Sequence, residues 1–343
     1  MSTIGTVDCG FLATYQGKAA QMWTDPIANI DLIGDVEAAK AVLENQQISM
    51  TELTGKKKRT VSLEWLQKCD ITTTACTDDC TIDGEDADPI CKEYEIECLR
   101  ETKFKMPKRA YRERTIEMAE AFAFNMLQHK KALDEWLARY IVTGILAAAG
   151  TNAYTGGVGT VAGALTTIPA ASWNDSIWGY FNLVTRYNKF KSPYLLTGDN
   201  LYQLLFNRMH ESMTEAGRAA MSKIGTIRKI YQDPENVETV APNHTFLLHK
   251  TAVAFINKAW NPLGAANAVP EAGIYALWSE PSNNIPGVYY DIITQETCVE
   301  NEFYLAAKVQ LHGLFAENPL PCDETNTGVL HLPVADENIK HNV

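Results

Sequence analysis

Residues 115–150 carry the strongest structural signal in this chain of 343 residues, and they read TIEMAEAFAFNMLQHKKALDEWLARYIVTGILAAAG. Apolar residues recur at intervals of three and four, which is the period of one face of an α-helix. Thr115 is a suitable N-cap, and Gly150 is a suitable residue just past the C-terminal end. The sequence predicts one helix of about 35 residues and about 50 Å, whose apolar stripe must be covered by a sheet or by another copy of the chain. The stripe, with one polar gap at Lys130, consists of Ile116, Ala119, Phe122, Ala123, Met126, Leu127, Leu133, Leu137, Tyr140, Ile141 and Ile145.

Charge is distributed very unevenly in the residues that precede this helix. Residues 70–101 contain eleven acidic and two basic side chains, a local charge of about −9 within a net charge of −12. In residues 102–114 the sign of the charge reverses, because this stretch contains six basic side chains and a single acidic one, Glu113. One interpretation is a solvated, flexible insertion, because a block of like charge repels itself. The other is a projecting hairpin whose acidic tip meets a basic surface, such as the basic stem of a neighbouring copy.

The remaining elements are predicted from hydrophobic period and turn residues. Residues 1–55 are predicted to be an arm with one short helix, for which Asp31 is the N-cap. The predicted helices are residues 32–46, 173–187 and 199–210, and the predicted strands are residues 60–65, 94–99, 194–198, 227–231, 245–256, 287–293 and 303–315. The last two of these strands are expected to pair with each other in antiparallel fashion.

Signatures of catalysis and of cofactor binding are absent from the sequence. It has no G-x-S-x-G nucleophile elbow, no phosphate loop and no H-E-x-x-H motif. The glycines of residues 157–163 have the wrong spacing for a dinucleotide loop and follow a helix where a strand is required. The seven histidines are scattered, without metal-ligand spacing. We therefore predict that the protein is not an enzyme, and we assign no catalytic, cofactor-binding or metal-ligating residue and no cofactor.

Five of the eight cysteines lie in or beside the acidic segment, and they are Cys69, Cys76, Cys80, Cys91 and Cys98. Four thiolates suffice for a tetrahedral zinc site, but the spacings are looser than those of a zinc ribbon. Whether these cysteines are free, bonded as disulfides or bound to zinc stays open, and free thiols are the favoured interpretation. A calcium loop that starts at Asp79 is disfavoured, because its twelfth position is Ile90 where a glutamate is required.

The composition excludes several classes of protein. Apolar residues make up 46% and charged residues 21%, as in ordinary folded soluble domains. The N-terminus lacks the basic start and apolar run of a secretory signal, and the longest apolar stretch, residues 141–149, is too short to span a bilayer. The acidic net charge argues against a sequence-specific nucleic-acid reader. We expect a soluble protein that has no membrane partner.

The order of these segments resembles a known family of shell-forming proteins. An arm, a charged hairpin, one very long helix, a mixed α/β region and long C-terminal antiparallel strands resemble the Hong Kong 97 fold of major capsid proteins from tailed bacteriophages, herpesviruses and encapsulins. Residues 313–319 and 326–330 also look like the C-terminal regions of phage capsid proteins. The resemblance implies an α+β, Hong Kong 97-like capsid fold. Its parts would be an N-terminal arm (1–55), an E-loop (56–112), a P domain with the spine helix (113–170), an A domain (171–286), and closing P-domain strands with a tail (287–343). Residues 327–332 would join those closing strands.

The same resemblance implies a function. The chain would be a self-assembling major capsid protein that forms the icosahedral head shell around packaged double-stranded DNA, in virions assembled in the cytoplasm of a bacterial host. Its partners would be further copies in hexamers and pentamers, a portal, and a separate scaffolding protein, because the arm is too short to contain a cleaved scaffold. DNA would be enclosed without sequence-specific contacts. No motif matches the crosslinking lysine and asparagine of some family members, so no crosslink is assigned. The alternatives are an encapsulin-like compartment and a metal-binding protein built around the cysteine-rich segment.

Overall fold

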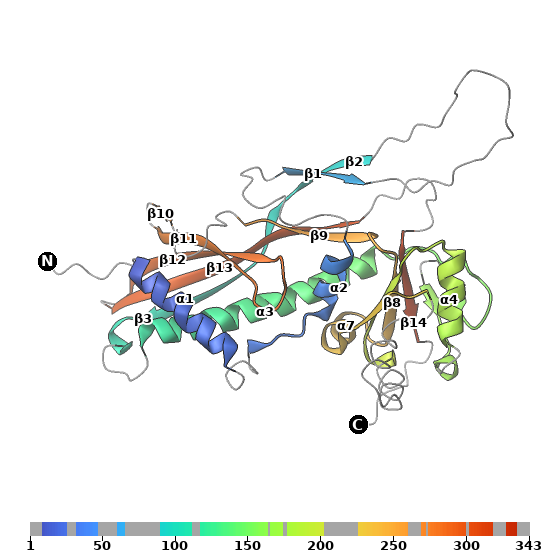
Figure 1. The fold of residues 1–343 in the computed structure, drawn as a ribbon, viewed down its shortest axis with the longest axis horizontal. Coiled ribbons are helices and arrows are strands. Elements are labelled where there is room, and N and C mark those ends of the chain that lie inside the picture. The colour runs from blue at the N-terminus through green and yellow to red at the C-terminus, as the bar shows by residue number, and fades with distance from the viewer. Residues whose placement is uncertain are drawn as a thin grey trace, which may run out of the picture. The chain divides into compact units, whose positions relative to one another are not determined.

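The computed structural model describes residues 9–25, 32–46, 60–65, 90–111, 117–163, 165–173, 177–201, 226–259, 269–271, 274–299, 302–317 and 327–334. The described residues form an α+β fold with one long helix and two six-stranded sheets (Figure 1). The chain divides into two compact units. Unit 1 comprises Met1–Arg59, Ile96–Val142 and Phe255–Phe315, and unit 2 comprises Thr60–Glu95, Thr143–Ala254 and Ala316–Val343.

The long helix of unit 1 is α3 (Met118–Ala147), and its 30 residues confirm the predicted rod. At 1.5 Å per residue it is about 45 Å long. Its apolar stripe is buried as expected, for example at Phe122, Met126 and Leu137, each 0% exposed. Thr115, the predicted N-cap, lies outside the described residues.

The sheet of unit 1 is antiparallel along its whole path. Its order is β10 (Val269–Glu271), β11 (Ile274–Pro281), β12 (Tyr289–Val299), β13 (Glu302–Glu317) and β3 (Glu97–Pro107), and β9 (Val253–Asn257) pairs with β13 off this path. The register of β12 and β13 runs from Asp291 opposite Gln310 to Val299 opposite Glu302. This confirms the predicted pair of long C-terminal strands. Buried and half-buried residues alternate along β13, as they do in a strand with one covered face.

The N-terminal region packs on unit 1 of its own chain. Helix α1 (Cys9–Thr24) places the ring of Tyr15 5.2 Å from Phe122 and 6.5 Å from Trp278. This helix was not predicted, because Gly10 and Gly17 weaken its helical signal.

Helix α2 (Glu37–Asn45) follows in the same region, and it is shorter than predicted. Val36 occupies the N-cap position and makes no side-chain cap hydrogen bond, so the predicted start at residue 32 is wrong. Asp31, the expected cap, lies outside the described residues. The helix is held by its buried face, which includes Ala38, Ala39, Ala41 and Val42, each 0% exposed, and not by a cap.

Unit 2 is built on a mixed sheet. Its order is β4 (Thr160–Ala162), β5 (Leu165–Thr167), β14 (Val329–Pro333), β8 (His244–Leu248), β6 (Tyr194–Thr197) and β7 (Lys229–Gln232). β14 is parallel to β5 and β6 is parallel to β7, while β8 is antiparallel to both of its neighbours.

Two predictions about strands fail in unit 2. The predicted strand at 245–256 is two strands, β8 and β9, because a turn with Thr251 at φ 70° separates them. Residues 327–332 were grouped with the strands at 287–315, yet β14 pairs with β5 and β8 in the other sheet. That grouping is wrong, because every residue of β14 is buried and the strand belongs inside a sheet with two covered faces.

Helices α4 (Ile177–Tyr187) and α7 (Pro234–Val240) flank this sheet, and Figure 1 draws them on either side of β8 and β14. The predicted helix at 173–187 is confirmed from Ile177 onward. Its buried face joins one apolar cluster with the sheet, formed by Ile168, Ile177, Trp178, Tyr180, Phe181, Val184, Phe190, Leu195, Leu201, Ile227, Leu247, Leu330 and Leu332. Of the predicted helix at 199–210, only the short 3-10 turn Asp199–Leu201 lies within the described residues.

A histidine pair is buried between β8 and β14. The rings of His244 and His331 are 4.2 Å apart, and the ring of His331 also stacks on Phe246 at 5.3 Å. Burial, and then the neighbouring His244, lower the pKa of His331 to about 4. Burial also lowers the pKa of His244. The folded sheet therefore favours neutral imidazoles.

Acid is expected to destabilise unit 2 through this pair. Between pH 6.5 and about 4 the unfolded imidazole of His331 is protonated while the folded one is not, so the free energy of unfolding falls as the pH falls across that window. The loss is about 2 kcal/mol after allowance for solvent screening. Urea unfolding at a series of pH values should reveal it, and His331→Phe should flatten the dependence. An unchanged slope in that variant would contradict the assignment.

Candidate functional surfaces

An antiparallel hairpin forms the base of the acidic segment. β1 (Thr60–Trp65) and β2 (Ile90–Glu95) pair over six positions, from Thr60 opposite Glu95 to Trp65 opposite Ile90. β1 was predicted, whereas the predicted strand at 94–99 spans the end of β2 and the start of β3. The pairing of β1 with β2 favours the hairpin interpretation over a wholly unstructured insertion. Among the described strands, β1 and β2 pair only with each other. A two-stranded ribbon is marginally stable in water, so this hairpin needs a further surface to rest on.

The hairpin strands are joined by residues 66–89, which lie outside the described residues. Their sequence contains seven acidic side chains and one basic side chain, a net charge of about −6. Because Trp65 pairs with Ile90, both ends of this segment start from one point. A doubled-back chain of this length reaches at most about 40 Å from that point. The hairpin therefore presents a concentrated negative charge at one end.

Two of the basic residues that follow the hairpin, Lys103 and Lys105, lie on β3, and the charge of Lys103 is compensated within the chain. Nζ of Lys103 lies 2.5 Å from Oε1 of Glu101, and Nζ of Lys308 lies 3.7 Å from Oε2 of the same carboxylate. Gln310 donates to that carboxylate at 2.9 Å. The hydrogen bonds from Lys103 and Gln310 lower the pKa of Glu101, so its charge persists at neutral pH.

Other cations of the basic stem also have partners in their own unit. Lys108 forms an ion pair with Glu296 of β12. Nζ of Lys105 lies 5.2 Å from the ring centre of Tyr304. The change from acidic residues (70–101) to basic residues (102–114) suggested that the basic stem is free to bind the acidic tip of a hairpin. Among the described stem residues, Lys103 and Lys108 are paired with carboxylates of their own chain. The contact between an acidic tip and the stem of a neighbouring copy stays a prediction.

The polar gap in the long helix is a buried ion pair. Nζ of Lys130 lies 3.5 Å from Oε2 of Glu280, and both side chains are nearly inaccessible to solvent. The same carboxylate accepts hydrogen bonds from the hydroxyl of Tyr15 at 2.7 Å and from the indole of Trp278 at 2.8 Å. Glu280 thus ties α1, α3 and β11 together, which rigidifies unit 1.

A second buried carboxylate, Asp134, lies on α3 one helical turn after Lys130. Asp134 is 0% exposed and accepts hydrogen bonds from Ser282 at 2.7 Å, from Asn284 at 3.0 Å and from Tyr290. Burial raises the pKa of Asp134, and these three hydrogen bonds oppose that shift. Asn284 also accepts from the amide of Gly34 at 3.2 Å, which anchors the N-terminal region. The sequence offered no sign that this aspartate lies in the core.

The residues considered for metal binding are not brought together within the described part of the chain. Cys69, Cys76 and Cys80 lie outside it, Cys91 lies in β2 and Cys98 lies in β3. Cys98 and Cys298 are free and exposed. In the described ranges, no group of three or more histidine, cysteine or acidic side chains is arranged to hold a metal ion.

Two further sequence features can be placed. The glycines at 157–163 flank β4: Gly157, at φ 78°, lies in a turn before the strand, and Gly163, at φ 61°, follows it, and glycine adopts both conformations without strain. None of the helices in the described ranges has the length and apolar character needed to cross a membrane.

Comparison with known proteins gives structural likenesses only. No family model matches the chain, and no curated protein matches it. The chain is similar to a chain of the Cyanophage A-1(L) capsid asymmetric unit, with a TM-score of 0.47, 11% identity and coverage of 97% of this chain and 94% of that one. It is also similar to the capsid structure of Cyanophage P-SCSP1u (TM-score 0.45, 10% identity, 87% and 89% covered) and to the capsid of Myoviridae phage XM1 (0.43, 10%, 86% and 90%). At these identities and TM-scores, no residue role or partner is carried over from those proteins.

Proposed function

We propose that this chain is a self-assembling shell subunit, the major capsid protein of a tailed-phage head, and not an enzyme. The shell would be icosahedral and would enclose double-stranded DNA in the virion. Copies of the chain would be its main partners, and a scaffolding protein and a portal would join them during assembly in a bacterial cytoplasm.

The observation that carries this proposal is the separate two-stranded hairpin of β1 and β2. Six residue pairs hold it at its base, no third described strand joins it, and a strongly acidic segment follows. Such an element gains stability by resting on a neighbour, and contacts of this kind repeated between copies close a shell. The long helix with its five-stranded antiparallel path supports the proposal by providing a rigid body that can carry such contacts.

The parts of the proposed capsid fold can be assigned to the described elements. The P domain would comprise the N-terminal helices, α3 and the sheet of β10 to β13 with β3, and the A domain would comprise the sheet of β4 to β8 with α4 and α7. The E-loop would be the hairpin of β1 and β2 with its acidic segment, which shortens the expected range of 56–112. β10 and β11 would belong to the P domain and β4, β5 and β14 to the A domain, which revises the expected boundaries at residues 170 and 287.

Assembly of the purified chain is the direct test. Negative-stain microscopy and sedimentation of the expressed protein, alone and with its scaffold, are expected to give rings or closed shells. A chain that stays monomeric under all salt and scaffold conditions would contradict the proposal. Shells filled with protein in place of DNA after expression with the remaining head components would favour the encapsulin-like alternative.

The hairpin provides the matched variant for this experiment. Replacing residues 66–89 by Asn-Gly, a turn suited to two-residue hairpins, should leave the fold and solubility intact while abolishing closed shells. The control keeps the length of the segment but replaces its aspartates with asparagine and its glutamate with glutamine. Comparing the two variants distinguishes the effect of the segment's length on shell formation from the effect of its charge. Normal shells from the shortened variant would show that the hairpin is not an assembly element.

A further inference from the structure

Two neighbouring histidine rings lie where β8 meets β14, a contact that we call the β8–β14 seam. The ring centres of His244 and His331 are 4.2 Å apart. His331 is 9% exposed, and its Nε2 has no hydrogen-bond partner in the described part of the chain. A protonated imidazole donates from both nitrogens, so a charged His331 would bury a donor that has no acceptor in the closed seam.

The surroundings of His331 are apolar. Its ring stacks on Phe246 with the ring centres 5.3 Å apart, and Leu165 of β5 lies opposite it in the parallel register. Leu330 and Leu332, its neighbours along the strand, belong to the apolar cluster that includes α4. Because side chains alternate across a strand, His331 lies on the opposite face of the sheet from that cluster. A positive charge at this position is therefore costly in the closed sheet.

Among the described residues, one carboxylate acts on the pair, and it acts on His244. Glu238 of α7 favours the protonated form of His244, against the larger effect of burial. Both oxygens of Glu238 already accept hydrogen bonds from amides, those of Asp199 at 2.8 Å and Asn243 at 2.7 Å. Burial, and then His244, lower the pKa of His331 to about 4. The closed seam therefore keeps His331 neutral at a pH where a histidine in water is protonated.

β14 is the strand through which β4 and β5 join the rest of their sheet. The sheet order is β4-β5-β14-β8-β6-β7, so among the described strands the neighbours of β5 are β4 and β14. Backbone hydrogen bonds close the two ends of the seam, from His249 to Gly328 at 2.7 Å and from Val334 to Asn243 at 3.1 Å. Opening of this one seam therefore separates β4, β5 and β14 from β8, β6 and β7.

We propose that the His244–His331 pair makes the β8–β14 seam pH-sensitive, so that protonation of the pair opens the seam while unit 1 stays folded. Opening exposes both imidazoles to water, where each can be charged and hydrogen-bonded. A site that binds protons more tightly when it is open favours the open form as the pH falls, below about 6.5 for a histidine. The opening is local, because unit 1 has a core of its own. It would occur in the chain whether or not the chain assembles.

Hydrogen exchange of the full chain, followed by mass spectrometry, tests this proposal. The amides of His249 and Val334 report on the seam, because their hydrogen bonds cross it. Their protection factors, corrected for the effect of pH on the intrinsic exchange rate, should fall about tenfold between pH 7 and pH 5. Electron-transfer fragmentation of the peptides locates the exchange at these residues.

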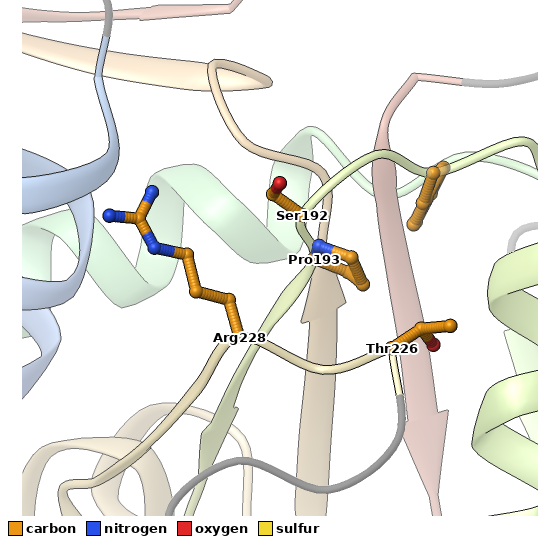
Figure 2. Close-up of a pocket in the computed structure, with 5 residues that line it drawn as sticks. Ser192, Pro193, Thr226 and Arg228 are labelled. Carbon is orange, nitrogen blue, oxygen red and sulfur yellow. The ribbon is translucent and has the colours of Figure 1, made fainter.

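The far edge of the same sheet provides the internal control. The amide of Arg228 donates to the carbonyl of Pro193 at 2.7 Å, and that of Asp233 donates to the carbonyl of Thr197 at 3.0 Å. Both amides therefore report on the junction of β6 with β7. Arg228 and Pro193 also line the pocket shown in Figure 2. Protection at these two amides and along α3 of unit 1 should change less than about twofold over the same pH range.

Replacing His331 with phenylalanine distinguishes the effect of the proton from that of packing. His331→Phe keeps an aromatic ring against Phe246 but cannot be protonated, so protection at the seam should change less than about twofold between pH 7 and pH 5. His244→Phe leaves one titrating ring in the pair, and the fall should be smaller than in the wild type. His129→Phe is the matched control, because this histidine stacks on Phe104 in unit 1, and it should leave the tenfold fall unchanged.

Four results would overturn the proposal. One is a fall in His331→Phe as large as that in the wild type. Another is protection at the seam that does not change with pH in the wild type. A third is an equal fall at the seam, at Arg228 and along α3, which would mean that acid unfolds the chain as a whole. The fourth is an undiminished fall in His244→Phe, a comparison that still decides if His331→Phe does not fold.

Discussion

Replacing Asp134 with alanine is expected to lower the free energy of unfolding by about 3 kcal/mol, because it leaves buried hydrogen-bond donors without an acceptor. The side chains of Ser282, Asn284 and Tyr290 all donate to this carboxylate inside unit 1. Each buried donor that loses its partner costs about 1–3 kcal/mol, and relief of the desolvated carboxylate returns part of that cost. Chemical unfolding monitored by tryptophan fluorescence measures the change, since Trp278 lies fully buried in the same unit.

Two further variants make this prediction specific. Asp134→Asn keeps one acceptor oxygen and should lose about half as much stability. Glu135→Ala, at the next position of α3, removes only a half-exposed carboxylate 3.7 Å from Lys131 and should cost less than about 0.5 kcal/mol. Equal losses from Asp134→Ala and Glu135→Ala would show that the buried acceptor is not what holds this region.

Replacing Gly150 with alanine is expected to destabilise unit 2 by about 2–3 kcal/mol, because a Cβ there collides with the backbone. The added carbon would lie 2.7 Å from the amide nitrogen of Thr327, and closer still to its hydroxyl. Gly150 also donates its amide to the carbonyl of Val329 at 2.9 Å, so the two segments cannot separate without losing a hydrogen bond. Thermal unfolding with far-ultraviolet circular dichroism is the measurement.

Gly179 supplies the control of opposite sign. It lies exposed within α4, and a Cβ there would meet nothing within 4 Å. Gly179→Ala is therefore expected to raise the free energy of unfolding by about 0.5–1 kcal/mol, through higher helix propensity. Destabilisation by both alanines, or by neither, would contradict the steric account of Gly150.

Gly150 also shows what the sequence alone does not determine. Gly150 was expected to end the long helix as its C-terminal glycine, but the helix ends at Ala147. The glycine is required three residues later, where the chain passes against residue 327. A helix-ending glycine and a glycine of close approach look identical in a sequence, because the second depends on a segment 177 residues away.

The sequence by itself determined the elements whose signal is local. The long helix α3, the pair β12 and β13 and the hairpin strand β1 follow from periodicity within short windows, because a helix face or a strand face is set by neighbouring residues. Only the tertiary structure decided which distant groups meet. It placed β14 in the second sheet, gave Lys130 and Asp134 partners about 150 residues away, and paired Lys108 of the basic stem with Glu296. Burial and ion pairing are properties of that arrangement, so charge counted along the chain located the acidic segment but did not show which cations are paired.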